Sequence, residues 1–173
     1  MKKTPGFTLI ELAIGLAILG ILVMAALPSY TAWIQNTQIR TAAESVLSGM
    51  QLARAEAVRR NTNVRLVFGA ASSWTVSVPG TGEQIQARTS GEGSQNVTVT
   101  KTPATATTIT FNSLGRVVAN ADASASITQV ELDVPTSILA AAESRELRIV
   151  VSAGGNVRMC DPNVTDATDP RKC

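Results

Sequence analysis

The first part of the chain carries a long apolar run. No charged residue occurs over the 16 positions from Leu12 to Leu27, and counted from Phe7 the run has 21 residues with Glu11 inside it. A helix rises about 1.5 Å per residue, so a run of this length crosses the roughly 30 Å hydrocarbon core of a bilayer. We predict a transmembrane helix over residues 7–27. Lys2 and Lys3 precede it and favour a cytoplasmic N-terminus.

A second apolar pattern follows, with helical spacing. Arg40 and Glu44, and likewise Glu56 and Arg60, stand four residues apart as opposite charges, which supports a helix. We predict an amphipathic helix over 28–62 that continues the first and ends at the polar run 61–63. One apolar stripe along it is the surface on which a soluble domain would pack. Its members are Ile39, Ala43, Val46, Met50, Ala53 and Ala57.

From residue 63 onward the hydrophobic period changes to two and β-branched residues dominate, as is typical of strands. The predicted strands are 64–68, 74–78, 97–101, 108–111, 127–134 and 146–152, and Gly154-Gly155 forms a hairpin turn after the last of them. Residues 79–95 form a polar insertion with room for one weak strand, and 119–126 form a loop. The predicted fold is therefore α+β: a long N-terminal α-helix, half transmembrane and half amphipathic, packed on an antiparallel β-sheet domain at 63–173.

Glu11 is the unusual residue of the apolar run. A carboxylate inside a membrane helix costs at least about 2.5–3.5 kcal/mol on insertion scales, so it indicates a function. The run contains no Lys or Arg to pair with it. A cut just before Phe7 would free an amino group, and offset neighbouring helices would pair the ammonium of one copy with the carboxylate of another. We infer that Glu11 is uncompensated in a single chain and satisfied only in an assembly.

A signal peptide or a plain membrane anchor is the alternative interpretation of the same run. The best small-residue cleavage site is Ala25-Ala26, and it lies inside the continuing helical pattern. A cleaved secretory signal is therefore disfavoured.

The stretch KKTPGFTLIELAIGLAILGILVMAALPSY resembles the N-terminus of type IV pilins and of type II secretion pseudopilins. The resemblance implies that residues 1–6 are a leader, that prepilin peptidase cuts between Gly6 and Phe7, and that Phe7 is N-methylated. It also implies that Glu11 pairs with the N-terminus of a neighbouring subunit during assembly. Pro28 stands where pilin helices often bend.

The β half carries a second resemblance. FNSLGRVV, residues 111–118, is similar to the Phe-x-x-x-Gly-Arg element of the GspH/FimT-type minor pilins and pseudopilins, and RELRIVVSAGGNVRMCDP is similar to their closing hairpin. The implied fold is an N-terminal helix carrying β-sheets that do not follow the plan of major pilins. Within this element we interpret Arg116 as a turn or core-edge residue.

The chain has two cysteines, Cys160 and Cys173, which in an exported chain indicate one disulfide. Closing a loop of this length contributes roughly 3 kcal/mol in the chain-entropy estimate. Free thiols are the alternative. A zinc site is disfavoured because zinc takes four nitrogen or sulfur ligands and the chain has no histidine.

The composition disfavours an enzyme. Without histidine the commonest general base is missing, no Ser-x-x-Lys motif activates a serine, and no glycine-rich run is followed by the Lys-Ser/Thr of a phosphate loop. We therefore expect no catalytic residues, no cofactor and no metal. Once Lys2 and Lys3 are removed, 13 basic side chains face 13 acidic ones, so no overall attraction to nucleic acid follows.

Three cations near the C-terminus, Arg158, Arg171 and Lys172, are the candidates for a weak nucleic-acid contact. Family members that act in DNA uptake carry Gly-Arg-x-Arg at the closing hairpin. Here the run is Gly155-Asn156-Val157-Arg158, so the first arginine is missing. Asp161, Asp166 and Asp169 would also repel phosphate, and a solvated surface is the favoured interpretation.

The resemblance implies a minor pilin that is incorporated at or near the tip of a type IV pilus and primes its assembly. A minor pseudopilin of type II secretion is the alternative, followed by a DNA-binding minor pilin; a major pilin and an anchored periplasmic enzyme are less favoured. The implied partners are other minor and major pilins or pseudopilins, prepilin peptidase and the inner membrane. The implied location is the bacterial inner membrane, with a single span and a periplasmic C-terminal domain, and later a pilus or pseudopilus.

Overall fold

The computed structural model describes residues 8–173, apart from the side chains of Ala25, Ala26 and Pro28. The chain divides into two compact units, one ending at Ile34 and the other comprising Gln35–Cys173. The leader and Phe7 lie outside the described residues. The domain boundaries expected from the sequence remain predictions.

One long helix, α1 (Leu9–Arg60), opens the described chain. It ends in a Schellman motif, in which the N–H of Asn61 donates to the carbonyl of Val58 (3.3 Å) and that of Thr62 to the carbonyl of Ala57 (3.2 Å). Asn61 takes a left-handed conformation, φ 50°, which asparagine tolerates better than most residues. The polar run after residue 60 therefore ends the helix as predicted.

In the first unit, the α1 residues that are described expose nearly all of their apolar side chains. Leu9 is 86% exposed and Met24 75%. An 18-residue window of the helix has a mean hydropathy of 2.6, long and apolar enough by length and composition to cross a membrane.

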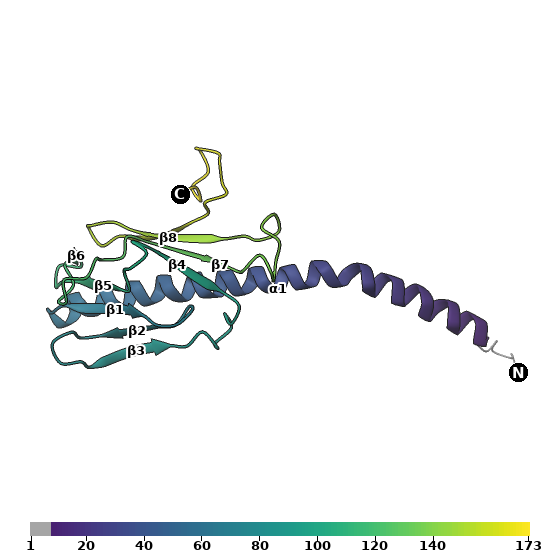
Figure 1. Cartoon of the computed structure of the whole chain (residues 1–173), viewed down its shortest axis with the longest axis horizontal. Coiled ribbons are helices and arrows are strands. Elements are labelled where there is room, and N and C mark those ends of the chain that lie inside the picture. The colour runs from purple at the N-terminus through teal and green to yellow at the C-terminus, as the bar shows by residue number, and fades with distance from the viewer. Residues whose placement is uncertain (1–7) are drawn as a thin grey trace, which may run out of the picture. The chain divides into compact units, whose positions relative to one another are not determined.

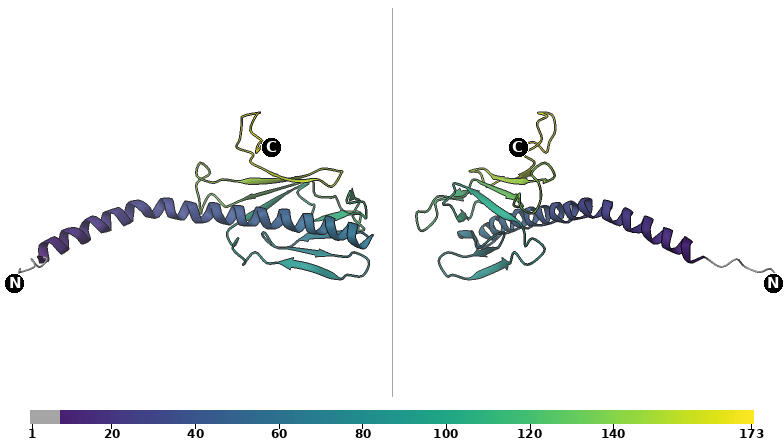
Figure 2. Two further views of the ribbon diagram at one scale, coloured as in Figure 1. Left: turned by 180° about the vertical axis from the view of Figure 1, so that it is seen from behind. Right: turned by 45° about the vertical axis from the view of Figure 1, so that its right-hand side comes forward.

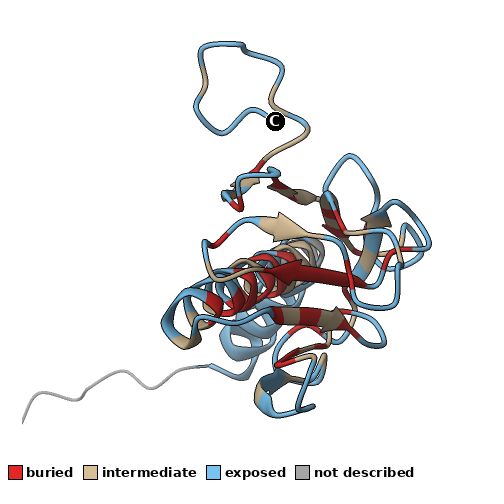
Figure 3. Cartoon of the chain, turned by 90° about the vertical axis from the view of Figure 1, so that its left-hand side faces the viewer, coloured by how far each residue is buried: buried red, intermediate tan, exposed pale blue. Residues whose placement is uncertain are grey.

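In the second unit, the apolar stripe of α1 is the centre of the core. All six residues of the predicted stripe, from Ile39 to Ala57, are fully buried. The two predicted charge pairs are also present, Arg40 Nε to Glu44 Oε1 at 2.8 Å and Arg60 Nε to Glu56 Oε2 at 2.7 Å. Figure 3 shows the buried side of the helix facing the strands.

The strands form two sheets (Figure 1). The five-stranded sheet has the order β3 (Gln84–Arg88), β2 (Trp74–Ser77), β1 (Val64–Phe68), β5 (Thr108–Phe111) and β6 (Val117–Val118). The four-stranded sheet has the order β4 (Thr98–Thr102), β7 (Gln129–Asp133), β8 (Leu147–Val151) and β9 (Val157–Cys160). All neighbouring strands in both sheets pair antiparallel.

The strand predictions hold, with ends that differ by at most two residues. β1 and β5 coincide with the predicted ranges, β3 is the weak strand inside the polar insertion, and β9 is the second arm of the hairpin. The two-residue β6 is not among the predicted strands. The predicted β-sheet domain is thus confirmed, and the structure adds its division into two sheets.

The core lies between α1 and the two sheets. In Figures 1 and 2, β2 and β3 lie below α1 and β8 lies above it. Residues alternate in burial along β1 and β7, as expected for strands with one face inward. Trp74 of β2 reaches the helix, where its Nε1 donates to Ser45 Oγ at 2.9 Å.

Candidate functional site

Glu11 lies in a capping box at the start of α1. Its backbone N–H donates to Thr8 Oγ1 (3.3 Å), and its Oε2 accepts hydrogen bonds from the backbone N–H (2.9 Å) and the hydroxyl (2.7 Å) of Thr8. The reciprocal pair satisfies backbone donors that the first turn of a helix otherwise leaves unpaired.

The expectation that Glu11 has no countercharge in a single chain stays a prediction, and the structure adds local hydrogen bonds that the sequence analysis did not foresee. The Glu11 carboxylate already has two hydrogen-bond donors from Thr8. The missed signal was present in Thr8-Leu9-Ile10-Glu11, which fits the Ser/Thr-x-x-Glu pattern of a capping box. What the unit lacks is a countercharge, because residues 8–34 contain no Lys or Arg.

The other N-terminal positions are less well defined. Gly6 and Phe7, the expected cleavage pair, lie outside the described residues. Pro28 lies within the range of α1, and the helix bend there remains a prediction.

The FNSLGRVV element forms the tight turn between β5 and β6. Asn112 Oδ1 accepts the backbone N–H groups of Leu114 and Arg116, both at 3.0 Å. Gly115 takes a left-handed conformation, φ 72°, and its carbonyl accepts Arg54 Nε of α1 at 3.1 Å. The side chain of Arg116 is exposed, in agreement with its interpretation as a turn residue. The motif therefore holds the β5–β6 turn against α1.

The closing hairpin packs against this same turn. Gly155, φ 82°, lies so close that a Cβ atom placed on it would overlap the carbonyl oxygen of Gly115. Nearby, Val117 N–H of the five-stranded sheet donates to Ala153 C=O of the hairpin at 3.2 Å. The two sequence elements that carry the β-half resemblance thus meet where the two sheets touch.

A disulfide joins Cys160, at the end of β9, to Cys173. The backbone N–H of Asp161 donates to the carbonyl of Arg171 at 2.7 Å, which closes the base of the loop. The expected covalent loop is therefore present, and it holds residues 161–172 on the last strand.

The three C-terminal cations all bind acceptors of this loop. Arg158 Nη1 donates to Lys172 C=O (3.1 Å), and Lys172 Nζ donates to Thr165 C=O (3.1 Å). Arg171 contacts both carboxylate oxygens of Asp169 at 3.1 and 2.7 Å. These side-chain hydrogen bonds, together with the backbone N–H of Arg171, lower the pKa of Asp169 to about 2. Each of the three cations is thus engaged with an acceptor of the loop.

The described residues hold no group of three or more His, Cys, Asp or Glu side chains arranged to bind a metal.

Comparison with known proteins identifies two families. The profile described as type II transport protein GspH matches residues 42–155, and the prokaryotic N-terminal methylation motif matches residues 1–27. A search of curated proteins returned no significant match.

Among solved structures, the fold is similar to the type IV minor pilin FimU of Pseudomonas aeruginosa. The match to its P21 crystal form has a TM-score of 0.51 and 15% identity, and covers 74% of this chain and 95% of that one. The match to its P65 form has a TM-score of 0.49 and 16% identity, and covers 73% and 99%. At this identity the likeness concerns the fold.

Both the family and the fold are those of structural, non-enzymatic subunits, as the sequence analysis expected. Pilins and pseudopilins assemble with one another, and the apolar helix agrees with membrane anchoring. Because the GspH profile spans more than half of the chain and the methylation motif precedes it, this protein belongs to the GspH family of type IV pilin-like subunits.

Proposed function

We propose that the protein is a minor pilin of a type IV pilus, which is incorporated at or near the tip and primes assembly. The observation that carries this proposal is the likeness of its fold to the minor pilin FimU, which extends over 95% of the FimU chain. The methylation motif at residues 1–27 supports processing by prepilin peptidase between Gly6 and Phe7.

The capping box suggests how Glu11 would take part. Its carboxylate is held at the first turn of α1 by Thr8, close to the position where cleavage would create a new amino terminus. The side chain is therefore already ordered before a second subunit arrives, which lowers the entropy lost on pairing. The ammonium of a neighbouring subunit would supply the countercharge that residues 8–34 lack.

A minor pseudopilin of type II secretion is the second candidate. It is favoured by one observation, the match of residues 42–155 to the profile described as type II transport protein GspH. The methylation motif is expected in either assembly.

A clean deletion in the native host tests the proposal. Surface pili, twitching motility and secreted enzyme activity would be scored on the same strains, with the gene restored on a plasmid as the control. We expect loss of pili with normal secretion. Loss of secretion with normal pili would contradict the proposal and favour the pseudopilin.

DNA binding is the remaining candidate, carried by Arg158, Arg171 and Lys172. A gel shift with the full chain in detergent, repeated at increasing salt, tests it. We expect no salt-dependent shift, because all three cations already bind acceptors of the loop.

A further inference from the structure

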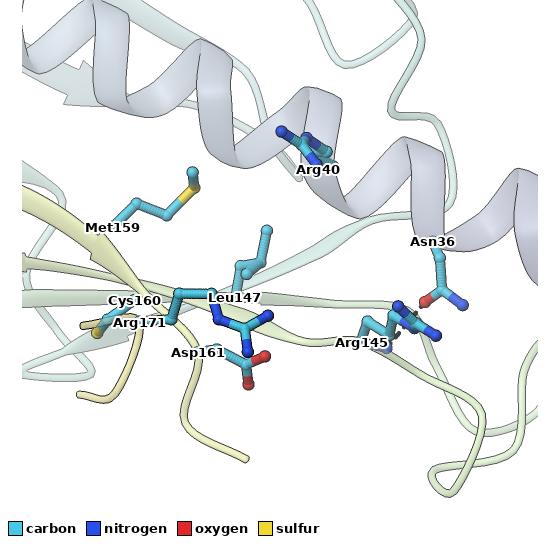
Figure 4. A pocket seen from close by; sticks show the side chains of 8 residues that line it. All are labelled: Asn36, Arg40, Arg145, Leu147, Met159, Cys160, Asp161 and Arg171. Atoms are coloured by element: carbon cyan, nitrogen blue, oxygen red, sulfur yellow. Dashed lines mark hydrogen bonds between the residues drawn. The ribbon is translucent and has the colours of Figure 1, made fainter. Parts of the chain in front are cut away.

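A pocket of about 280 Å³ opens in the second unit, between α1, the start of β8 and the base of the disulfide loop. Figure 4 shows the side chains that line it. They come from three distant parts of the sequence: Asn36, Arg40, Arg145, Leu147, Met159, Cys160, Asp161 and Arg171.

Hydrogen bonds and a disulfide hold the walls of the pocket in place. Asn36 joins α1 to the chain before β8, because its Nδ2 donates to Glu143 C=O (2.9 Å) and its Oδ1 accepts the backbone N–H of Arg145 (2.8 Å). On the other side, the Cys160–Cys173 disulfide and the Asp161–Arg171 backbone hydrogen bond hold the loop in place. A ligand would therefore enter a cavity that exists before binding.

The charged side chains that line the pocket are mostly basic, and their charge balances once the carboxylate partners of Arg40 and Arg171 are counted. Arg40, Arg145 and Arg171 line it together with one carboxylate, Asp161. Arg171 is neutralised by Asp169, and Arg40 is bound to Glu44. Among residues 8–173, no carboxylate forms an ion pair with Arg145, and only its backbone N–H, not its guanidinium, forms a hydrogen bond. Arg145 is thus the unpaired cation of the pocket.

A second arginine of the pocket, Arg40, can exchange its partner Glu44 for an incoming anion. The Arg40–Glu44 pair is exposed, with side-chain exposures of 73% and 54%. Exposed pairs of this kind contribute only about 0–1 kcal/mol, so an incoming anion can share Arg40 at little cost. Arginine binds carboxylates with geometric specificity through its planar fork.

The pocket also has an apolar part, formed by Leu147 and Met159. Its volume lies just below the range of roughly 300–1,000 Å³ typical of small-molecule sites. It accommodates one short segment or side chain, and not a nucleic-acid strand. The matching chemistry is a carboxylate on a short apolar stem.

We propose that this pocket receives a carboxylate of a neighbouring pilin subunit, a glutamate side chain or a chain end, with Arg145 as its principal contact. The identity of the donor rests on the proposed function, whereas the preference for a carboxylate rests on the pocket alone. The pocket would select a partner through the one carboxylate that it buries. The apolar N-terminal helices would supply most of the contact area between subunits.

Binding is tested with the full chain, leader removed, in detergent. The probes are the dipeptides acetyl-Leu-Glu-amide and acetyl-Leu-Gln-amide, which differ in charge and hardly in shape, measured by calorimetry. We expect the carboxylate probe to bind at least about tenfold more tightly, because a hydrogen bond to a charged group is stronger than one to an amide.

The variant Arg145→Gln should remove that preference. Arg116→Gln is the matched control, since Arg116 is also an exposed arginine and lies on another part of the domain. Equal binding of the two probes, or an unchanged preference in Arg145→Gln, would overturn the proposal. So would displacement of the dipeptide by a short DNA duplex, which would make the pocket a phosphate site.

The donor is identified in cells by a photo-crosslinking amino acid at position 147, which lines the same pocket and leaves Arg145 in place, with position 116 as control. We expect a crosslink from position 147 to an acidic peptide of another pilin subunit, and Arg145→Gln in the same chain should abolish it. A crosslink confined to non-pilin proteins would contradict the assignment of the donor. The dipeptide result does not depend on assembly, so failure of the proposed function and failure of the pocket are distinguishable.

Discussion

At the scale of single residues, Glu11 has two separate requirements, hydrogen-bond donors for its oxygens and a countercharge, which the sequence alone does not distinguish. Its hydrogen bonds are satisfied by Thr8, while its charge has no partner in residues 8–34. A buried charge needs both kinds of compensation, so a second subunit remains necessary for the charge even though the helix start is well formed.

This separation predicts the effects of substitutions at Glu11. Glu11→Gln keeps a side chain that can cap the helix but removes the charge, whereas Glu11→Ala removes both. We expect both variants to insert and to be cleaved normally, yet to be recovered in sheared filaments at least about tenfold less than the wild type, as for the loss of one desolvated ion pair.

Thr8→Ala is the control, because it removes the cap and leaves the charge. Its recovery in filaments should fall less than that of either Glu11 variant, because Thr8 only orders the carboxylate whereas the ion pair needs its charge. Normal incorporation of Glu11→Gln would show that capping, and not charge, is what assembly requires.

At the scale of elements, the C-terminal end of α1 is held by a charge network. Glu56, whose side chain is 15% exposed, lies between Arg59 and Arg60 at 2.6 and 2.7 Å. Hydrogen bonds from Arg59 and then Arg60 lower the pKa of Glu56 to about 2. Arg60 also reaches Glu83 on the connection before β3, so the network ties the helix end to the five-stranded sheet.

The lowered pKa predicts a pH dependence of stability. The contribution of Glu56 is fully present above its unfolded pKa near 4.5 and is lost as the pH falls toward about 2. We expect Glu56→Gln to be less stable than the wild type at pH 7 and the difference to shrink between pH 4.5 and 2. Urea unfolding followed by the fluorescence of the buried Trp74 measures this difference.

The pKa of Glu146 is shifted in the opposite direction to that of Glu56. Burial, and after it the carboxylates of Asp133 and Glu131, raise the pKa of Glu146. Its ionisation therefore opposes folding as the pH rises, and Glu146→Gln should be more stable than the wild type at pH 7 and equal to it at low pH. If both variants respond to pH in the same direction, the charge assignment at these two sites is wrong.

The disulfide loop is a second element with a separable contribution. It closes between residues 13 apart in sequence, and the Asp161–Arg171 backbone hydrogen bond lies at its base. We expect the double variant Cys160→Ser/Cys173→Ser to lose roughly 3 kcal/mol of unfolding free energy, the chain-entropy value for a loop of this length.

The wild type under reducing conditions should behave like the double serine variant. Hydrogen exchange should increase in residues 161–172 and stay unchanged in the five-stranded sheet. An increase throughout the second unit would show that the disulfide supports the whole domain.

At the scale of the whole molecule, the two sheets are joined at one close contact. Gly155 in the closing hairpin lies against Gly115 in the β5–β6 turn, and Arg54 of α1 binds the same Gly115 carbonyl. Helix, first sheet and second sheet meet there, so an added side chain would push all three apart.

Gly155→Ala is therefore expected to destabilise the fold. Its positive φ and the overlap with Gly115 each carry a cost, and the loss should be about 1–3 kcal/mol of unfolding free energy. Gly154→Ala is the matched control: a Cβ there meets only Ser152 Oγ, at 3.8 Å, and the change should stay within about 0.5 kcal/mol. Equal stability of the two variants in urea unfolding would contradict a tight contact at Gly155.

The sequence determined the elements of this protein because their signals are local. The 3.6-residue stripe and the charge pairs specify α1, the alternation of apolar residues specifies most strands, and the N-terminal motif specifies the family. The hydrogen-bond partner of Glu11, Thr8, could also have been predicted from the sequence, since a capping box needs only residues three apart.

Only the tertiary structure decided how distant segments meet. Strand order places β1 beside β5 and β7 between β4 and β8, and it divides the strands into two sheets. The Gly115–Gly155 contact and the pocket that unites Asn36 with Arg145 and Arg171 depend on that order. No periodicity records such contacts, because pairing between strands far apart in sequence is selected by the packing of the complete core and not by any local preference.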